Sequence, residues 1–573
     1  MEDKNYLFEQ NLLALSASDP ALCSRLSAAE TTRNCYKFLT SRSGKIVPAI
    51  TGPGGAAHPL HSLVDPEREG ERLAAAAGED DGFLVFLGLG GAYAIEAALA
   101  GENAGRVLAV EYNINGVAEL LCSREYIGML GDPRFRLLVD PSPELLEAYI
   151  LENYQPALSG GIRTFPLRAR VEEDRARFGG AGEAVARAIE KVSADYSVQA
   201  WFGKRWFSNI IRNLRAAEGD YGPVPAIREA AVCAAGPSLD SAIPLIRERR
   251  ARDANGVYLV AADTSLSALL AGGIRPDAVV SIDCQHISSR HFTKDLPPGT
   301  ELFLDLASPP LVASRSARPR FFSGGHPLAG YASRMWRSFP SVDSSGGNVA
   351  YAALSLAEYL GASKIHVYGA DFSYPRGLVY ARGTYLYPYF GERQNRLSPL
   401  EGLFSGFLYR NPSLAKVRRE NGDWYYETDT LSFYRKRFEE KAARLSSGQA
   451  RPAAGGSAVI SVTGPRERRI FSAGVPRMSA GEFLRRYRKG IRELGKGGRR
   501  VPAGLSAEEK LLLATLLPGA AVFKGRNSRV RTAELLEEVT AWCAGEIDRV
   551  LAAWDAPRSG AAWEKPVCRG NAD

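Results

Sequence analysis

Six short apolar runs between Glu229 and Gly369 constrain the fold of this chain more than any other feature of its sequence. Stretches with helical spacing separate these runs, so strand-like and helix-like segments alternate along the chain. Because strand–helix–strand crossovers are right-handed, this alternation predicts a mostly parallel sheet. The predicted strands span residues 229–235, 257–262, 278–282, 301–304, 320–323 and 364–369.

A shorter version of the same pattern precedes these runs. Residues 83–87 predict a buried strand, 88–91 a glycine-rich turn and 92–99 a helix. Two further strands are expected at 106–110 and 135–139. Helical periodicity over about 181–214 then closes the segment, and the Gly- and Pro-containing residues 219–225 predict a linker.

The sequence after the sixth run is less regular. Residues from about 375 to 464 are aromatic and polar, and the Ser/Gly/Ala/Pro-rich stretch 446–456 predicts a flexible loop. Ser479 with Glu482, and Ser506 with Glu509, have the spacing of helix capping boxes. A final apolar stripe is typical of a buried core or of a dimer interface, and a homo-oligomer is therefore left open; the stripe comprises Leu535, Val539, Trp542, Val550 and Trp554.

These patterns together predict an α/β protein with several domains, as expected for 573 residues at roughly 150 residues per domain. The predicted parts are a Rossmann-like N-terminal domain that ends in a long helix (1–222), a central Rossmann-like domain with a mostly parallel sheet (223–400), an irregular connecting region with a flexible loop (401–470) and a helical C-terminal domain (471–573).

Composition narrows the function classes. Seven cysteines are scattered without CxxC spacing, which argues against a zinc cage or a disulfide framework. The first residues lack the pattern of a secretion signal, and no apolar run approaches the about 20 residues of a membrane-spanning helix, so we expect a cytoplasmic protein. The net charge of +8 favours anionic partners. Since no nucleic-acid-binding motif is present, a phosphate or a sugar acid explains that charge at least as well as nucleic acid does.

The strongest candidate for a ligand-binding turn follows the first run of the central segment. Gly236 lets the backbone turn sharply, Pro237 fixes φ, and Ser238 can cap the helix that begins near Leu239. The free N–H groups at the start of such a helix bind phosphate. Many strand-to-helix turns use the same residues for geometry alone, and this alternative stays open.

Acidic residues end several of the predicted strands. Asp263, Asp283 and Asp371 each follow an apolar run, at the edge where open α/β sheets bind ligands. Each one alone could simply cap the next helix, most readily Asp263 ahead of Thr264 and Ser265. As a set, they favour a site.

A second turn suited to phosphate precedes the last crossover helix. It comprises Ser345, Gly346, Gly347 and Asn348. Small residues allow a ligand to reach the backbone, and Asn348 could hydrogen-bond to a base or a sugar, although helix capping would select a similar sequence.

Several of these motifs occur together in one known family. Gly-Pro-Ser-Leu at 236–239, Ala-Asp-Thr-Ser at 262–265, Pro-Asp-x-Val-x-Ser-Ile-Asp at 276–283, Ser-Gly-Gly-Asn-Val at 345–349 and Tyr-Gly-Ala-Asp-Phe at 368–372 resemble the core of the motility accessory factor (Maf) family. His61-Ser-Leu-Val-Asp-Pro66, the Gly88 turn and Trp206-Phe-Ser-Asn-Ile-Ile-Arg-Asn213 are also similar to that family. The resemblance covers about residues 5–390.

The resemblance implies a function. Enzymes of this family transfer nonulosonic acids, which are sialic-acid-like pseudaminic or legionaminic acids, from a CMP-activated donor to serine or threonine of flagellin. Their central domain also resembles bacterial sialyltransferases. By implication Gly236 to Leu239 lie at the donor phosphate, Asp263 near the ribose or sugar, Ser345 to Asn348 at the nucleotide and Asp371 beside the reacting centre. Ser265 is also among the implied donor-binding residues.

The chain departs from that pattern in its general base. The related sialyltransferases have a histidine after the strand that ends at Asp371, whereas this chain has no histidine beyond His366, and Tyr380 occupies the expected region. The candidate catalytic residues are therefore Asp371, Tyr380 and Asp283, with His286 as a further candidate base. His286 and His291 are expected to hydrogen-bond rather than to bind a metal.

Three other functions remain open from the sequence. The Gly-Pro-Ser-Leu domain also resembles 6-hydroxymethylpterin diphosphokinase, which would use ATP and Mg²⁺, with Asp263, Asp283 and Asp371 as available carboxylates. The Gly88 turn with Glu111 could bind S-adenosylmethionine, although packing is the better explanation of so weak a motif. A non-catalytic flagellin-binding protein would fit the missing histidine, with the basic residues of 485–492 as a docking face.

Overall fold

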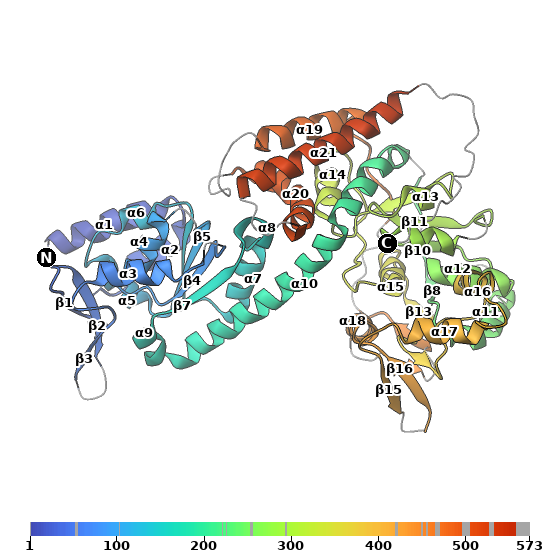
Figure 1. Cartoon of the computed structure of the whole chain (residues 1–573), viewed down its shortest axis with the longest axis horizontal. Coiled ribbons are helices and arrows are strands. Elements are labelled where there is room, and N and C mark those ends of the chain that lie inside the picture. The colour runs from blue at the N-terminus through green and yellow to red at the C-terminus, as the bar shows by residue number, and fades with distance from the viewer. Residues whose placement is uncertain are drawn as a thin grey trace. The chain divides into compact units, whose positions relative to one another are not determined.

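The computed structural model describes residues 2–556 except 32, 52–54, 79, 102–103, 220–221, 225, 253–255, 293–294, 419–421, 448–450, 454–456, 464–469, 496–504 and 527–531 (Figure 1). The chain forms two compact units. The first comprises Met1–Gly203 and Glu493–Ala541, and the second comprises Lys204–Arg492 and Trp542–Asp573. Most of the predicted flexible loop at 446–456, and Cys568, lie outside the described residues.

The first unit contains a parallel sheet with the strand order β6-β5-β4-β7. The three strands expected here are confirmed, and the sequence reading missed the fourth, β7, and a three-stranded antiparallel sheet near the N-terminus. The strands are β4 (Phe83–Leu87), β5 (Arg106–Glu111), β6 (Phe135–Val139) and β7 (Ile162–Pro166), with β1 (Lys37–Thr40), β2 (Ile46–Thr51) and β3 (Ala57–Pro59) in the small sheet.

Strand β4 shows why this sheet forms. All five of its residues are buried, as expected for a parallel strand covered on both faces. Leu84 and Phe86 pack on one face and Phe83, Val85 and Leu87 on the other. Helices cover both faces: α1 (Glu2–Ser16), α2 (Pro20–Ser27), α4 (Tyr93–Ala100), α5 (Ile114–Leu121) and α6 (Ile127–Leu130) contribute to one core, and α7 (Pro143–Asn153) and α10 (Arg175–Asn213) to the other.

The second unit contains an eight-stranded sheet with the order β12-β11-β10-β9-β8-β13-β18-β17. The first six strands in that order are parallel, which confirms the predicted central sheet, and β18 and β17 add antiparallel pairs at one edge. The strands are β8 (Glu229–Cys233), β9 (Tyr258–Ala262), β10 (Ala278–Ser281), β11 (Glu301–Asp305), β12 (Arg320–Phe322), β13 (Lys364–Tyr368), β17 (Arg451–Ala453) and β18 (Ser457–Ser461).

The region expected to be irregular contains regular structure. Besides β17 and β18, residues 401–470 hold the 17-residue helix α18 (Asp429–Leu445) and the strands β15 (Ala415–Arg418) and β16 (Trp424–Glu427). These strands pair with β14 (Tyr374–Pro375) in a small antiparallel sheet. Their lysine, arginine and glutamate side chains obscure the alternation that marks a strand in sequence.

One helix anchors the core of the second unit. α15 (Val349–Tyr359) buries eight residues because it packs across β8, β9 and β10. Phe438, Ala442 and Leu445 of α18 belong to the same core. The core therefore fixes α18 against the central sheet, close to the loops that leave its strands.

The remaining helices of this sheet connect its strands and shape its edges. α11 (Leu239–Arg252) and α12 (Asp263–Ala271) follow β8 and β9, and the short 3₁₀ helix η2 (His286–His291) follows β10. The others are α13 (Pro310–Ala313), α14 (Pro327–Met335), α16 (Leu386–Gly391) and α17 (Leu400–Leu408).

The C-terminal region is helical, as predicted. Its helices are α19 (Ala480–Gly495), α20 (Ala507–Arg526) and α21 (Thr532–Asp555). Both capping boxes form their first bond, from Glu482 N to Ser479 Oγ (3.1 Å) and from Glu509 N to Ser506 Oγ (3.2 Å). This region is not a compact unit by itself, because the unit boundaries fall after Arg492 and Ala541. None of the described helices combines the length and apolarity needed to cross a bilayer.

Candidate active site

The central sheet reverses its strand order between β8 and β13. From β8 the chain continues to β9 on one side, while β13 lies on the other side of β8. Loops that leave such neighbouring strands diverge, and open α/β sheets bind ligands in the resulting crevice at the carboxyl edge. The turn at Gly236 follows β8, and Asp371 follows β13, so both lie at this point.

The structure brings the Gly236 turn and Asp371 together. Gly236 N donates to the carbonyl of Gly369 at 2.8 Å, and a Cβ on Gly236 would overlap both that carbonyl and Asp371 Oδ2. Ser238 donates to Asp371 Oδ2 from its amide (3.1 Å) and from its hydroxyl (2.8 Å). The Ser238 amide, which we expected to bind a donor phosphate, is therefore engaged by a carboxylate of the protein itself.

Two other residues of these motifs have structural contacts. Leu239, the first residue of α11, is fully buried, so its side chain is not open to a ligand. Ser265 is also fully buried, and its hydroxyl donates to the carbonyls of Cys233 (2.8 Å) and Ala262 (2.7 Å). In this structure Ser265 links β8 to β9, and Pro237 remains partly exposed in the turn.

Asp263 lies behind the edge, fully buried at the start of α12. Its Oδ1 accepts from Thr264 N (2.6 Å) and Thr264 Oγ1 (3.0 Å) and lies 3.2 Å from His291 Nδ1. Its Oδ2 accepts from Ser281 Oγ at 2.6 Å. Both oxygens of the carboxylate are thus engaged by side chains or backbone of the protein. His291 of η2 is the residue that lies between Asp263 and the carboxyl edge.

The charges around His291 shift the pKa values of this cluster. Burial works against the charged form of Asp263, but His291 and the hydroxyls of Ser281 and Thr264 outweigh it and hold the pKa of Asp263 below its usual range. Burial likewise works against protonated His291, but Asp263 and then Asp283 raise the pKa of the imidazole above its ordinary value. Burial, with a contribution from Asp263, raises the pKa of Asp283.

Three tyrosines border the same carboxylates. The ring of Tyr385 lies 4.8 Å from that of His291. Burial raises the pKa of Tyr380, to which Tyr385, Asp263 and Tyr434 also contribute, and burial and Asp283 raise the pKa of Tyr434. All three phenols therefore stay protonated at neutral pH and can donate hydrogen bonds.

Tyr434 is a residue of this site that the sequence analysis did not identify. It lies on α18, in the region expected to be irregular, and a Cβ on Gly347 would approach its ring to 3.1 Å. Its placement depends on the packing of α18 into the central core, and no local motif marks it.

The second turn is built mainly by its own residues. Asn348 caps α15, because its Oδ1 accepts from Tyr351 N at 2.9 Å and its Nδ2 donates to Gly346 O at 3.1 Å. A Cβ on Gly346 would overlap the ring of Tyr351. Gly347 has a φ of +72°, which favours glycine. Ser345 is exposed and accepts from Arg437 Nη2 at 3.3 Å, so a cation lies beside the turn.

Another strand-end acid was missed because the predicted strand stopped one residue short of it. Asp305 ends β11 and is 1% exposed; its Oδ1 accepts from Ala307 N (2.7 Å) and lies 3.5 Å from His326 Nε2. Among the described residues, none hydrogen-bonds to its Oδ2. Burial raises the pKa of Asp305, only partly offset by His326.

Two asparagines on α10 position the loops of this edge. Asn209 Nδ2 donates to the carbonyls of Cys284 (3.0 Å) and Ala307 (2.8 Å). Asn213 Nδ2 donates to those of Leu306 (2.9 Å) and Ser308 (2.8 Å). Both side chains are buried one helical turn apart, which explains the Asn-x-x-x-Asn spacing in the 206–213 motif.

The glycine turn of the N-terminal sheet is filled by the protein. Leu89 N donates to Glu111 Oε2 (3.1 Å), and Gly91 N donates to His61 Nε2 (2.8 Å). Glu111 is fully buried and pairs with buried Arg170 at 2.7 Å. A Cβ on Gly90 would approach His61 and Leu167 to 2.6 Å. These contacts support packing as the role of this turn.

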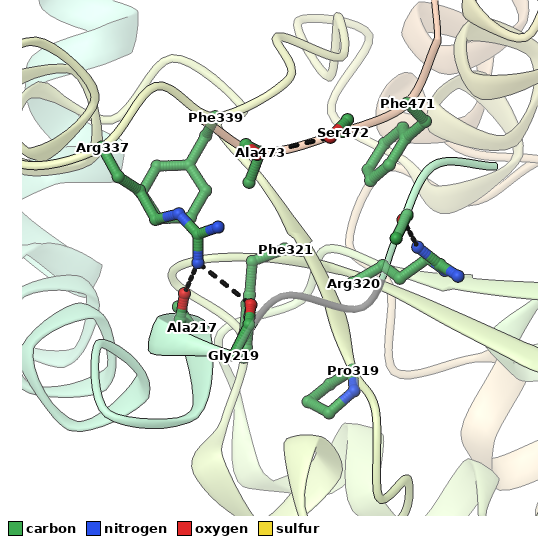
Figure 2. A pocket seen from close by; sticks show the side chains of 11 residues that line it. Ala217, Gly219, Pro319, Arg320, Phe321, Arg337, Phe339, Phe471, Ser472 and Ala473 are labelled. Atoms are coloured by element: carbon green, nitrogen blue, oxygen red, sulfur yellow. Dashed lines mark hydrogen bonds between the residues drawn. The ribbon is translucent and has the colours of Figure 1, made fainter. Parts of the chain in front are cut away.

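A small cavity elsewhere in the second unit has no such chemistry. Figure 2 shows Arg337 reaching the carbonyls of Ala217 and Gly219, with Phe339 and Phe471 nearby. Its volume of about 30 Å³ admits a water molecule but not a nucleotide. Arg337 also donates to Gly474 O (2.6 Å), so it ties together three segments of the unit.

Carboxylates and histidines at the central edge do not gather in the manner of a metal site. In the part of the chain that the structure describes, no group of three or more His, Cys, Asp or Glu side chains could hold a metal ion. Asp371 bonds to Ser238, whereas Asp263 and Asp283 both lie near His291, so the three carboxylates that the sequence offered as Mg²⁺ ligands do not form one cluster.

Comparisons with known proteins agree with this architecture. Residues 206–377 match the family model described as 6-hydroxymethylpterin diphosphokinase MptE-like. Two uncharacterized proteins of Treponema pallidum (strain Nichols) are similar over short segments. One is 42% identical over 122 residues, covering 21% of this chain and 42% of that protein, and the other is 40% identical over 110 residues, covering 18% and 50%. The chain thus spans half or less of these relatives.

A solved structure matches almost the whole chain. The Maf glycosyltransferase of Magnetospirillum magneticum AMB-1 superposes with a TM-score of 0.57 at 14% identity, over 96% of this chain and 95% of that one. The match confirms the fold predicted from the sequence motifs, with a Rossmann-like N-terminal part, a central parallel sheet and a helical C-terminal region.

Proposed function

We propose that this chain is a glycosyltransferase that moves a nonulosonic acid, of the pseudaminic or legionaminic type, from a CMP-activated donor to serine or threonine of flagellin in the cytoplasm. The observation that carries this proposal is the fold shared with a Maf glycosyltransferase over 96% of the chain. The carboxyl edge of the central sheet supplies the groups that such a transfer needs.

The second turn suits the nucleotide end of the donor. Arg437 reaches Ser345, so one cation lies beside small, partly exposed residues, whereas Lys441 is buried and pairs with Asp343 (3.3 Å) and Glu358 (2.7 Å). A cation paired with a hydroxyl is a common arrangement for binding phosphate. A CMP donor fits a site without a carboxylate cluster, because CMP leaves with a single phosphate that chelates no metal.

The tyrosines suit the departing phosphate. Tyr380, Tyr385 and Tyr434 remain protonated, because burial raises their pKa values, and each can donate a hydrogen bond where negative charge develops. The carboxyl of Asp283 is half-buried and lies close enough to help raise the pKa values of Tyr385 and Tyr434. These groups face one edge, where donor and acceptor would meet.

A second candidate function follows from the family model over residues 206–377, which describes a 6-hydroxymethylpterin diphosphokinase-like domain. That reaction would transfer pyrophosphate from ATP to the pterin with Mg²⁺. It requires magnesium held near the β- and γ-phosphates, whereas Asp263, Asp283 and Asp371 do not form one metal-binding cluster.

A direct assay separates the two candidates. The purified full chain is incubated with CMP-pseudaminic or CMP-legionaminic acid and flagellin, and the intact mass of flagellin and the release of CMP are followed. A parallel reaction contains ATP, the pterin and Mg²⁺. Addition of one sugar mass to flagellin without magnesium supports our proposal, and Asp283→Asn should slow it while Glu248→Gln, exposed on α11, should not. Pyrophosphoryl transfer without glycosylation would replace our proposal with the second candidate.

A further inference from the structure

A histidine and an aspartate pair at the carboxyl edge of the central sheet, in a chain that has no histidine beyond His366. Asp263 begins α12 after β9, and His291 ends η2 after β10. His291 Nδ1 lies 3.2 Å from Asp263 Oδ1 and 3.5 Å from Thr264 Oγ1. Ser267 Oγ donates to the carbonyl of His291 at 3.1 Å, which fixes the backbone beneath the ring.

The bonds to Asp263 set the proton positions of the imidazole. Both carboxylate oxygens are occupied by donors, from Thr264 to Oδ1 and from Ser281 to Oδ2, so the carboxylate cannot turn away from the ring. Because Asp263 accepts at Nδ1, that nitrogen carries the proton of the neutral ring. Nε2 then holds the free lone pair and can take a proton.

From this geometry we infer that His291 is the general base of the proposed glycosyl transfer and that Asp263 positions it. The inference rests on the proposed function. His291 Nε2 removes the proton of the acceptor hydroxyl while the hydroxyl oxygen bonds to the anomeric carbon of the donor sugar. The bond from that carbon to the phosphate oxygen breaks, and CMP leaves with the electron pair. The imidazolium then releases its proton to water.

The surroundings of His291 suit this role. Asp263 on α12, Asp283 after β10 and Tyr385 just before α16 face the imidazole, and α13, which also packs against η2, carries no titratable residue. Two carboxylates stabilise the imidazolium formed during transfer. The ring of Tyr385, at 4.8 Å, covers one side of the imidazole and limits its rotation.

A second histidine–carboxylate pair provides a matched control. His366 on β13 lies 2.5 Å from Glu229 on β8 through its Nε2. Strand register pairs Lys364 with Glu229, so this pair belongs to the amino half of the sheet, away from the carboxyl edge. His366 is also buried, and a substitution there tests the effect of losing such a pair on folding alone.

The test measures transfer from CMP-pseudaminic acid to flagellin by the full chain and its variants. His291→Asn should lower kcat by roughly 10²–10⁴-fold with unchanged CMP affinity, whereas His366→Asn should leave kcat unchanged. The wild-type kcat should fall as the pH falls through the pKa of His291, and this acid limb should disappear in His291→Asn. Asp263→Asn should lower kcat and move the limb to lower pH, because the carboxylate raises the pKa of the imidazole.

The outcomes distinguish this inference from the proposed function. If the wild-type chain transfers sugar and His291→Asn retains its rate, the base is another residue and the proposed function stands. If His291→Asn does not fold, the pH dependence of the wild-type kcat tests the assignment. A wild-type kcat that does not fall toward acid pH overturns the assignment of His291. If the wild-type chain transfers no sugar to flagellin, both the proposed function and this inference fail.

Discussion

The aspartates at the carboxyl edge of the central sheet show how one residue type acquires different properties at equivalent positions. Asp263 follows β9 and is surrounded by hydroxyl donors and a histidine, and its pKa is held below the usual range against the effect of burial. Asp305 ends β11, and its near partners are the amide of Ala307 and His326 at 3.5 Å; burial raises its pKa. The number and charge of the donors around each carboxyl, more than its place in the sheet, decide its protonation.

The pair of Asp263 and His291 should give the stability of the chain a characteristic pH dependence. The lowered pKa of Asp263 contributes stability above its unfolded value of about 3.9, and this is lost as the pH falls through the folded value. The raised pKa of His291 contributes stability below about 6.5, and this is lost as the pH rises through the folded value.

We therefore expect Asp263→Asn to cost about 1–3 kcal/mol in the free energy of unfolding near pH 5.5 and less near pH 9. Urea unfolding of the wild type and the variant at both values measures the difference. An equal loss at the two pH values would show that the pair contributes no charge interaction.

Gly236 should tolerate no side chain. A Cβ there would overlap Asp371 Oδ2 and the carbonyl of Gly369, and neither the turn nor β13 can move without breaking the contact between them. We expect Gly236→Ala to destabilise the chain by about 1–3 kcal/mol. Gly330→Ala is the matched control, because a Cβ at Gly330 on α14 meets no atom within 4 Å. A shift in the urea midpoint for Gly330→Ala as large as that for Gly236→Ala would contradict this explanation.

At the scale of elements, the sequence predicts best what is buried on both faces. Apart from β7, the parallel strands of both sheets are short, continuous apolar runs, and for this reason their positions could be predicted to within one or two residues. β7 and β15 to β18 carry charged residues, proline or partly exposed positions, so tertiary pairing rather than local pattern determines them.

The same reasoning explains which parts of the site were predictable. Strand ends are local features, and the acids at Asp263, Asp283 and Asp371 could be read from them. The pairing of His291 with Asp263 joins two elements 28 positions apart in sequence, and Tyr434 reaches the edge only because α18 packs into the central core. Neither contact corresponds to a motif or residue spacing that can be recognised in a single sequence.

The asparagines of α10 should act as a clamp on the loops after β10 and β11. Asn209→Ala leaves the buried carbonyls of Cys284 and Ala307 without this donor, which should cost about 1–3 kcal/mol in unfolding free energy. Because the first of these loops carries Asp283, glycosyl transfer should also slow. Ser197→Ala, exposed on the same helix, should change neither quantity. If urea unfolding shows normal stability for Asn209→Ala, the Asn209 hydrogen bonds do not stabilise these loops.

At the scale of the whole molecule, two Rossmann-like sheets of one chain differ in what occupies their ligand-binding edges. In the first unit, Glu111 and His61 accept hydrogen bonds from amides of the glycine turn, and Arg170 neutralises the buried carboxylate of Glu111. In the second unit, Ser345 and Gly347 are exposed, and Asp283, Tyr385 and Tyr434 are only partly buried. The fold is repeated, but protein groups occupy the amides of the first glycine turn, whereas these polar groups of the central edge remain partly exposed.

This difference predicts where CMP protects the backbone from hydrogen exchange. With CMP bound to the full chain, peptides that contain residues 283–291, 344–348 and 430–437 should exchange more slowly, whereas peptides over 88–91 should not change. The amides of Leu89 and Gly91 are already bonded to protein side chains and should be protected without any ligand. Hydrogen-exchange mass spectrometry with CMP, and separately with S-adenosylmethionine, measures both regions together. The opposite result would be slower exchange at 88–91 with S-adenosylmethionine and no change at the central edge with CMP. It would assign ligand binding to the first sheet instead of the second, because the side chains that fill the first turn would then have to move aside for a ligand.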